Sequence, residues 1–536
     1  METRKELLLL FVLGSAALAV VFWKTTKVGR RPQSWPPGPP TLPLIGNLHQ
    51  IPRHNRHLHT VRYTPWCWEG RAMVVLSSDQ AVKDLVDKRS AIYSSRPDAY
   101  IPQDIASDGL RPLFMEYGKT WRMVRKLAHS VLNVQVARTY VPYQDLEVKA
   151  MLMGLLESPS DFVNHVRRYT MSLTTQLTFG HRTPTSVDPT LLEVFDFFFW
   201  LTYAGEQSAA ILDVYPVTRS LPSHLFPITK HGKEYHEREH ALFMKLFLRA
   251  RSQLQQGTAM PCCCIDLLRL QKEQGFSDDI ACYMSGSLLQ AGSETTAAIL
   301  IGFVQAMVVF PEVAAKAQAE IDRICGDRLP DLNDFPDLPY IRGCVKESLR
   351  WMPAVTLGVP HAVTQDDSYL DYHIPKGSAV LINVWGIQND PARHTHPRRF
   401  DPSRWAADAQ NSAEAANNPD VSKRDHFAFG AGRRICQGMH IADRSLFLAI
   451  SRTLWAFDFK RAVDGRTGKA MVPDTDDLMD GLFTCPTPFK CNIVPRSSYR
   501  DLLVKKEWES AAGLLDENLQ WKAAPEGLVW RDYETQ

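Results

Sequence analysis

The chain has 536 residues, of which 45% are hydrophobic and 10% aromatic, so it is long enough to build a large buried core. Its 61 basic and 59 acidic residues leave a formal net charge of +2, which argues against a nucleic-acid partner, because such proteins carry a basic excess. Ten cysteines at irregular spacing exclude a disulfide framework.

An uncharged, almost wholly apolar run covers residues 7–23, at the short end of what a membrane-spanning helix needs. Four basic residues follow between positions 24 and 31, and this excess predicts that the rest of the chain faces the cytoplasm. The alternative is a cleaved signal peptide, since residues 17–19 read Ala-Leu-Ala, although that triplet lies inside the apolar run. We therefore expect residues 1–30 to be a single membrane anchor with its basic flank.

A proline-rich segment at 36–40 predicts a stiff spacer, and residues 73–76 read as a strand. A helix is then expected from Trp121, which stands four residues before Arg125 and so shares its face. An indole donor and a cation on one face can hold a carboxylate. The alternative is that Trp121 is core and Arg125 is solvated.

Helices are expected from about residue 140 to 251, and residues 195–201 are unusually aromatic. That run is typical of core packing; the alternatives are a lid over an apolar substrate channel and a surface that dips into the membrane. The contiguous cysteines 262–264 are predicted to lie in a loop.

Ser277, followed by two aspartates, is a favourable helix N-cap, and no proline follows before Pro311. So long and apolar a helix must run through the core. Glu294 and Thr295 interrupt it in mid-helix, where polar groups cost both helix propensity and desolvation. Such a polar notch suits proton delivery; the alternative is that Thr295 bonds back to a backbone carbonyl and bends the helix.

Glu347 and Arg350 lie on one face of a later helix, where an exposed pair would contribute little. Residues 353–360 are apolar and non-helical, and strands are expected at 369–375 and 379–384.

The stretch 429–438 contains three glycines and two arginines around Cys436, just before an apolar helix. Positive charge and a helix N-terminus both favour a thiolate. Such a thiolate can be a metal ligand, a nucleophile or a redox thiol. Zinc would require further cysteine or histidine ligands at suitable spacing, whereas a single thiolate ligand is the arrangement of a thiolate haem.

The pattern Phe429-x-x-Gly432-x-Arg434-x-Cys436-x-Gly438 resembles the haem-binding signature of the cytochromes P450. The Glu294–Thr295 notch, Glu347-x-x-Arg350 and the loop around Arg404 are similar to three further motifs of that family, in family order. The resemblance covers about residues 30–497. It implies a mainly α-helical P450 fold with small β-sheets, preceded by the single transmembrane helix. Residues 31–497 would be the haem domain, and 498–536 a C-terminal extension without an assigned role.

The resemblance also implies a role for each matching residue. Cys436 would ligate the iron of haem b, and Glu294 and Thr295 would deliver protons to bound dioxygen. Glu347, Arg350 and Arg404 would form a buried structural cluster. The expected propionate contacts are Trp121, Arg125, His361 and Arg434, with a surface position as the alternative for His361. Candidate substrate contacts are Ala291, Ala354, Val355, Leu357, Val359 and Phe483.

The implied activity is insertion of one oxygen atom from O2 into a lipophilic small molecule, as in fungal secondary metabolism. Electrons would come from NADPH through a P450 reductase docked on the arginine-rich loop, with the chain anchored in the endoplasmic reticulum membrane. A P450 that rearranges, ring-expands or couples its substrate is an alternative, and a haem sensor is a weaker one. The stretch from His59 to Val74 is shorter than the family pattern by about one strand, so the small sheet is expected to be abbreviated or the sequence to derive from an imperfect gene model.

Overall fold

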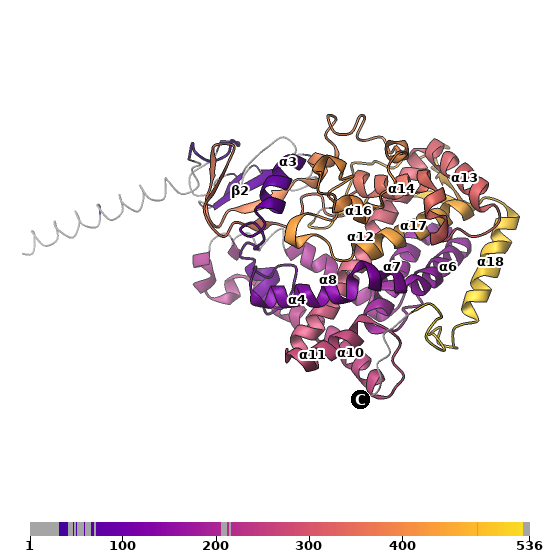
Figure 1. The fold of residues 1–536 in the computed structure, drawn as a ribbon, viewed down its shortest axis with the longest axis horizontal. Helices are drawn as coiled ribbons and strands as arrows, with labels where there is room; N and C mark the ends of the chain where they lie inside the picture. Colours follow the sequence, from indigo (N-terminus) through magenta and orange to yellow (C-terminus); the bar gives the residue numbers. More distant parts are fainter. Residues whose placement is uncertain are drawn as a thin grey trace, which may run out of the picture.

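The structure is a computed structural model, and it describes residues 32–40, 66–68, 71–204, 212–213, 216–479 and 481–528, together with the single positions 15, 47, 50 and 58. Helices dominate, and the sheet that contains residues 71–76, labelled β2, lies toward one end of the molecule (Figure 1). The helices are α3 (Asp79–Ala81), α4 (Lys119–Leu132), α5 (Val134–Thr139), α6 (Val141–Glu157), α7 (Phe162–Phe179), α8 (Pro189–Ala204), α10 (Pro227–Gln255), α11 (Cys263–Gln274), α12 (Asp278–Val309), α13 (Pro311–Cys325), α14 (Pro339–Trp351), α15 (Val384–Gln388), α16 (Ser412–Ala416), α17 (Met439–Ala456) and α18 (Ser498–Ala512).

Helix α12 is the centre of the fold, and it packs against α7, α8, α10, α11, α14 and α17. The side chain of Ser277 accepts the backbone N–H of Ile280 and caps its first turn, as the sequence predicts. The helix ends at Val309, just before the proline that begins α13. Most of its side chains are buried, and this all-round burial explains why its sequence shows no polar face.

The strands are β1 (Trp66–Trp68), β2 (Arg71–Leu76), β3 (His361–Ala362), β4 (Asp367–Tyr369), β5 (Tyr372–Ile374), β6 (Ala379–Ile382), β7 (Phe457–Arg461) and β8 (Cys491–Pro495). The main sheet has the order β1-β2-β6-β3, with β2 parallel to β6. β4 and β5 form a hairpin, and β7 pairs with β8 in a separate two-stranded sheet. The short stretch between His59 and Val74 thus still contains a strand, β1, which pairs antiparallel with β2 over three residues.

The sequence placed cysteines 262–264 in a loop, and this prediction was wrong. Cys262 is the N-cap of α11 and Cys263 begins the helix. All three thiols are buried in the main core, because the apolar side of α11 packs onto α7 and α12.

The C-terminal residues from Ser498 onward pack on the body of the protein. Helix α18 lies along α6 at the edge of the molecule (Figure 1), and Trp521 is buried, with its Nε1 donating to Gln176 Oε1 at 2.6 Å. Arg182 donates through Nη1 to the backbone oxygen of Leu519 at 2.7 Å. Residues 498–528 therefore share the main hydrophobic core.

The expected membrane anchor at residues 1–30 lies outside the described residues, apart from Ser15. Within the part of the chain that the structure describes, α12 is the helix whose length and composition would allow it to cross a membrane. Its burial identifies it as the core helix of the globular body.

Candidate active site

The loop around Cys436 is a compact turn that leads into α17. The backbone N–H of Cys436 donates to the carbonyl of Phe429 at 2.8 Å and closes the turn. Gly432 has a φ of +62°, and a Cβ there would lie 2.3 Å from the carbonyl oxygen of Val86. Its N–H donates to Asp87 Oδ1 at 2.9 Å, which fixes the loop to the π-helix Val82–Lys88. Glycine is thus required at this position by both conformation and space.

The Cys436 side chain is exposed in this structure, although protein groups surround its sulfur closely enough to displace much of the nearby water. Burial raises the pKa of the Cys436 thiol. The backbone N–H groups of Gly438 and Met439, together with the charge of Arg125, act in the opposite direction and lower it. These are the groups that would stabilise a thiolate if an electrophilic metal displaced the proton.

Three arginines converge beside this loop. Arg434 donates to the carbonyls of Ser94 and Met115 at 2.9 and 2.6 Å, Arg96 donates to those of Val359 and Pro360 at 2.7 Å, and Arg125 donates to the carbonyl of Ile435. Among the described residues none of the three arginines is paired with a carboxylate. Burial and mutual repulsion lower the pKa of Arg434 to about 8 and that of Arg96 to about 9. Such a cluster lacks a counter-ion and is complementary to a bound dianion.

Trp121 and His361 belong to the same cluster. The guanidinium carbon of Arg434 lies 4.1 Å from the centre of the Trp121 ring, and that of Arg125 lies 5.9 Å from it, so the predicted shared face of α4 is confirmed. The alternative of a surface histidine was wrong, since His361 is buried on β3 and its Nδ1–H donates to the carbonyl of Tyr93 at 2.8 Å. Burial and the charges of Arg96 and Arg434 lower the pKa of His361 to about 3.

The polar notch of α12 is built as the sequence suggests, with one difference. Thr295 donates its hydroxyl hydrogen to the carbonyl of Ala291 at 2.6 Å, the back-bonded geometry that was the alternative. Its oxygen keeps free lone pairs and can still accept a hydrogen bond. Ala291 is exposed although it lies in mid-helix. Gly292 allows α7 to pack closely against α12, because a Cβ at this position would lie 2.9 Å from Thr174 on α7.

Glu294 is 4% exposed, and its two carboxyl oxygens have different surroundings. Oε1 pairs with Arg167 Nη2 at 3.2 Å, whereas Oε2 is buried and has no hydrogen-bond partner. Burial raises the pKa of the Glu294 carboxyl, and Arg167 opposes part of that rise. The carboxyl therefore keeps its proton to a higher pH than an exposed glutamate does.

A small cavity adjoins this notch. Its lining is largely apolar and aromatic, and consists of Phe198, Phe199, Glu294, Thr295, Ala298, Ala354, Met479, Phe483, Thr484 and Cys485. Thr484 donates through its N–H to the carbonyl of Ala354 at 2.8 Å and through its hydroxyl to that of Pro353 at 3.0 Å. These bonds hold Thr484 against the segment 353–360 at the cavity wall.

Of the predicted substrate contacts, Ala354 and Phe483 line this cavity, whereas Ala291, Val355, Leu357 and Val359 do not. The aromatic run on α8 contributes Phe198 and Phe199, of which the second is also 37% exposed, so this helix is both core and cavity wall.

The predicted Glu347 cluster forms as a buried unit. Arg350 donates to both carboxyl oxygens of Glu347, at 2.8 and 2.7 Å, and Arg404 Nε lies 3.3 Å from Oε1. The sequence did not predict a fourth member, Trp405, whose Nε1 donates to Oε2 at 3.1 Å. Glu347 and Arg350 are both fully buried, which makes the geometry of this cluster rigid.

Sequence reasoning also missed Arg96. It follows Ser94 and Ser95 in a segment without regular periodicity, and it reaches the cluster only through the tertiary fold. Its buried guanidinium without an acidic neighbour is a signal that only the structure provides.

Comparisons with known proteins agree with this geometry. Residues 36–489 match the family model described as cytochrome P450. The chain is 64% identical over 534 residues to the cytochrome P450 monooxygenase virE of Hypocrea virens (strain Gv29-8 / FGSC 10586), covering 98% of this chain and 96% of that one. It is 53% identical to the cytochrome P450 monooxygenase fogE of Aspergillus ruber (strain CBS 135680), with 97% of each chain covered.

A solved structure has a similar fold. A zebra fish cytochrome P450, in a structure with progesterone, superposes with a TM-score of 0.66 at 24% identity, covering 82% of this chain and 99% of that one. This match supports the fold alone.

Proposed function

The chain belongs to the cytochrome P450 family of monooxygenases, and on that premise we propose that it inserts one oxygen atom from O2 into a lipophilic small molecule of fungal secondary metabolism. The observation that carries this proposal is the accessible Cys436 thiol beside three arginines that have no carboxylate partner among the described residues. A P450 of this family binds haem, whose two propionates are anionic. The arginine cluster therefore suits the propionates of such a group, and the thiol suits its iron.

In this proposal Cys436 ligates the haem iron, and Arg96, Arg125, Arg434 and Trp121 bind the propionates. His361 would donate to a propionate only after gaining a second proton, because its Nδ1–H is already given to Tyr93. The nearby arginines disfavour that proton until an anion is bound. When bound, a thiolate-ligated haem supplies activation of dioxygen by electrons from a partner.

Replacing Arg96 by glutamine is expected to weaken haem retention by about 10- to 100-fold, because hydrogen bonds to charged groups contribute roughly 1.5–3 kcal/mol. The measurement is the rate of haem transfer to apomyoglobin. The control is Arg122→Gln, an exposed arginine of α4, which should leave the rate unchanged. Equal rates for Arg96→Gln and the wild type would contradict a propionate role for Arg96.

Glu294 and Thr295 handle protons in the proposed reaction. Glu294 lies at the cavity wall, and burial raises the pKa of its carboxyl. It therefore keeps its proton to a higher pH and can supply that proton to the site. The Thr295 oxygen, whose own hydrogen is engaged with Ala291, can accept a hydrogen bond from a reacting group and position it.

The Arg167–Glu294 pair gives this proposal a pH signature. Productive turnover that requires protonated Glu294 falls as pH rises through the pKa of that carboxyl. Since Arg167 lowers this pKa, Arg167→Met should move the fall to higher pH, while Lys245→Met, at an exposed site, should not. Glu294→Gln should lower product formed per NADPH by about 100-fold and remove the pH-dependent fall. An unchanged profile in Arg167→Met would contradict the proton-donor role.

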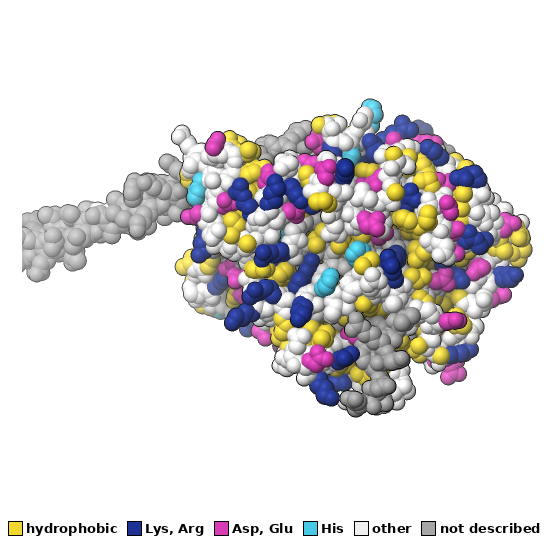
Figure 2. Space-filling model, viewed as in Figure 1, with side chains coloured by type: hydrophobic (Ala, Val, Ile, Leu, Met, Phe, Trp, Pro, Cys, Tyr) yellow, Lys and Arg dark blue, Asp and Glu magenta, His cyan; other side chains and the backbone are white. Residues whose placement is uncertain are grey.

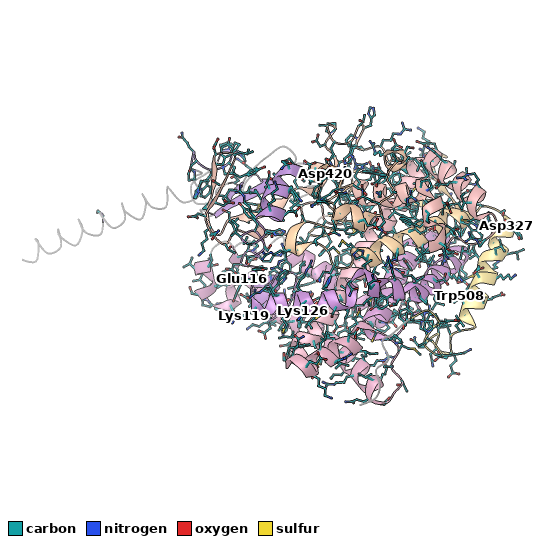
Figure 3. The ribbon with its side chains drawn as sticks, viewed as in Figure 1. Glu116, Lys119, Lys126, Asp327, Asp420 and Trp508 are labelled. Carbon is teal, nitrogen blue, oxygen red and sulfur yellow. The ribbon has the colours of Figure 1, made fainter. Side chains whose placement is uncertain are left out.

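Electrons are proposed to come from NADPH through a separate reductase. An exposed basic surface supports this, because Lys and Arg side chains gather over α4 (Figure 2) and those of Lys119 and Lys126 extend outward from the helix (Figure 3). Arg433, in the cysteine loop, is exposed as well. Such a surface suits an acidic electron donor. We further propose that residues 1–30 anchor the enzyme in the endoplasmic reticulum membrane, with residues 31–497 as a haem domain facing the cytoplasm and 498–536 as its extension.

The test is reconstitution of the full chain with a P450 reductase, NADPH and isotopically labelled dioxygen. The expected result is substrate-dependent consumption of NADPH and one labelled oxygen atom in the product. A product lacking labelled oxygen would instead support oxidative rearrangement, ring expansion or coupling. Absence of turnover with every lipophilic candidate, despite bound haem, would favour a sensor and overturn the proposal.

A further inference from the structure

A buried carboxyl oxygen of one residue in the cavity wall has no hydrogen-bond partner among the described residues. Thr295 and Thr484 line the cavity, but each gives its hydroxyl hydrogen to a backbone carbonyl. Glu294 is the charged residue in the lining, and its Oε2 is buried and unbonded. An unpaired buried carboxyl oxygen costs about 1–3 kcal/mol or more, so a ligand group that bonds it gains that amount of binding free energy. The unbonded oxygen therefore indicates where a substrate polar group is held.

The surroundings of Oε2 restrict that group to a neutral one. Arg167 already supplies the positive charge next to Glu294, so a cationic substrate would be repelled by the guanidinium. An anionic substrate would face the carboxylate itself. Burial raises the pKa of the Glu294 carboxyl above that of an exposed glutamate, and Arg167 opposes part of that rise. A hydroxyl group can donate to the carboxylate and accept from the carboxylic acid, so it satisfies either form.

The remaining lining is suited to a ring. The ring centroids of Phe198 and Phe483 lie 4.4 Å apart with an interplanar angle of 38°, and Phe199 completes an aromatic wall. Aromatic rings prefer tilted and offset contacts with other rings, which contribute about 0.5–1.5 kcal/mol beyond the buried area.

We propose that the substrate is a neutral aromatic molecule with a free hydroxyl group, held by a hydrogen bond to Glu294 Oε2 and by ring contacts with Phe198, Phe199 and Phe483. This assignment rests on the proposed monooxygenase function, whose cavity it describes. Glu294 then has two tasks, since the same carboxyl that handles protons also orients the ring. Binding to it would place the hydroxyl-bearing ring beside Thr295.

The experiment measures binding rather than turnover, on the haem-loaded full chain in detergent. β-Naphthol and its methyl ether are titrated by calorimetry, since they differ only in whether the oxygen carries a hydrogen. The wild type should bind the naphthol at least about 10-fold more tightly than the ether, as expected for a hydrogen bond to a charged group. Glu294→Leu should bring the two dissociation constants to within about 2-fold of each other.

Three further variants separate the causes. Glu294→Gln keeps a side chain that donates and accepts, so it should retain most of the preference and also provides a test if the leucine variant fails to fold. Phe483→Ala should weaken both ligands about equally and leave their ratio unchanged. Glu237→Leu, at an exposed glutamate of α10, is the matched control and should behave as the wild type.

Equal affinity of the wild type for the two ligands, or a preference that survives in Glu294→Leu, would overturn the substrate assignment. Neither outcome contradicts the proposed function, which is tested separately by the ferrous–CO spectrum of the same preparations. A wild-type spectrum without thiolate ligation would instead overturn the proposed function, and the binding ratio would then describe a cavity with another use.

Discussion

Replacement of Cys436 by serine is expected to abolish monooxygenase activity and the red-shifted Soret band of the ferrous–CO complex. The physical reason is that a serine hydroxyl does not ionise near neutral pH, so the electron-rich sulfur ligand is lost without a substitute. The loss of turnover should exceed the roughly 10- to 100-fold that removal of a group supporting a metal ligand usually causes. The measurement is the ferrous–CO difference spectrum, together with product formed in the reconstituted system.

The turn itself should survive this change. The bond that closes it runs from the Cys436 N–H to the Phe429 carbonyl and uses only backbone atoms. Cys491→Ser, on β8, is the matched control and should retain both the red-shifted band and the activity. A red-shifted band in Cys436→Ser would mean that another thiol is the ligand, and the proposed site would be wrong.

The second large effect is expected at Glu347. Glu347→Ala removes the acceptor of Arg350, Arg404 and Trp405 and leaves the fully buried Arg350 guanidinium without its carboxylate. Breaking a buried ion pair in this way costs about 3–5 kcal/mol, a large share of the roughly 5–15 kcal/mol that stabilises a typical domain. The measurements are the midpoint of urea unfolding, followed by tryptophan fluorescence, and the fraction of protein recovered with haem.

An exposed ion pair provides the comparison. Glu312 lies 3.6 Å from Arg399, and both side chains are more than half exposed. Glu312→Ala should cost about 1 kcal/mol or less, because water screens such pairs. Similar unfolding midpoints for Glu347→Ala and Glu312→Ala would show that the buried cluster does not stabilise the fold as argued.

The two sites are connected through the fold. Glu347 and Arg350 lie on α14, and Arg350 donates to the carbonyl of Gln388 at 2.9 Å. The side-chain oxygen of Gln388 in turn accepts the N–H of Phe427 at 2.8 Å, two residues before the loop that carries Cys436. The cluster thus acts on the site by positioning that loop, so Glu347→Ala should lower haem content as well as stability.

The sequence by itself determined the features that depend on local chemistry. The cap at Ser277 and the proline at 311 set the ends of α12, and helical spacing placed Trp121 beside Arg125 and Glu347 beside Arg350. The glycines of the cysteine loop predicted a tight turn, because only a residue without a Cβ tolerates a φ of +62° so close to another backbone. The family resemblance, carried by these same motifs, predicted the fold class.

Only the tertiary structure decided which residues complete the site. Arg96 joins Arg125 and Arg434 from a loop whose sequence has no periodic signal, and Gly292 is opposed by Thr174 from another helix. Whether an apolar residue of 353–360 lines the cavity depends on the path of the loop and not on its composition, so Ala354 lines it and Val355 does not. The unpaired Oε2 of Glu294 has the same origin, since burial and hydrogen bonding are properties of packing between segments far apart in the chain.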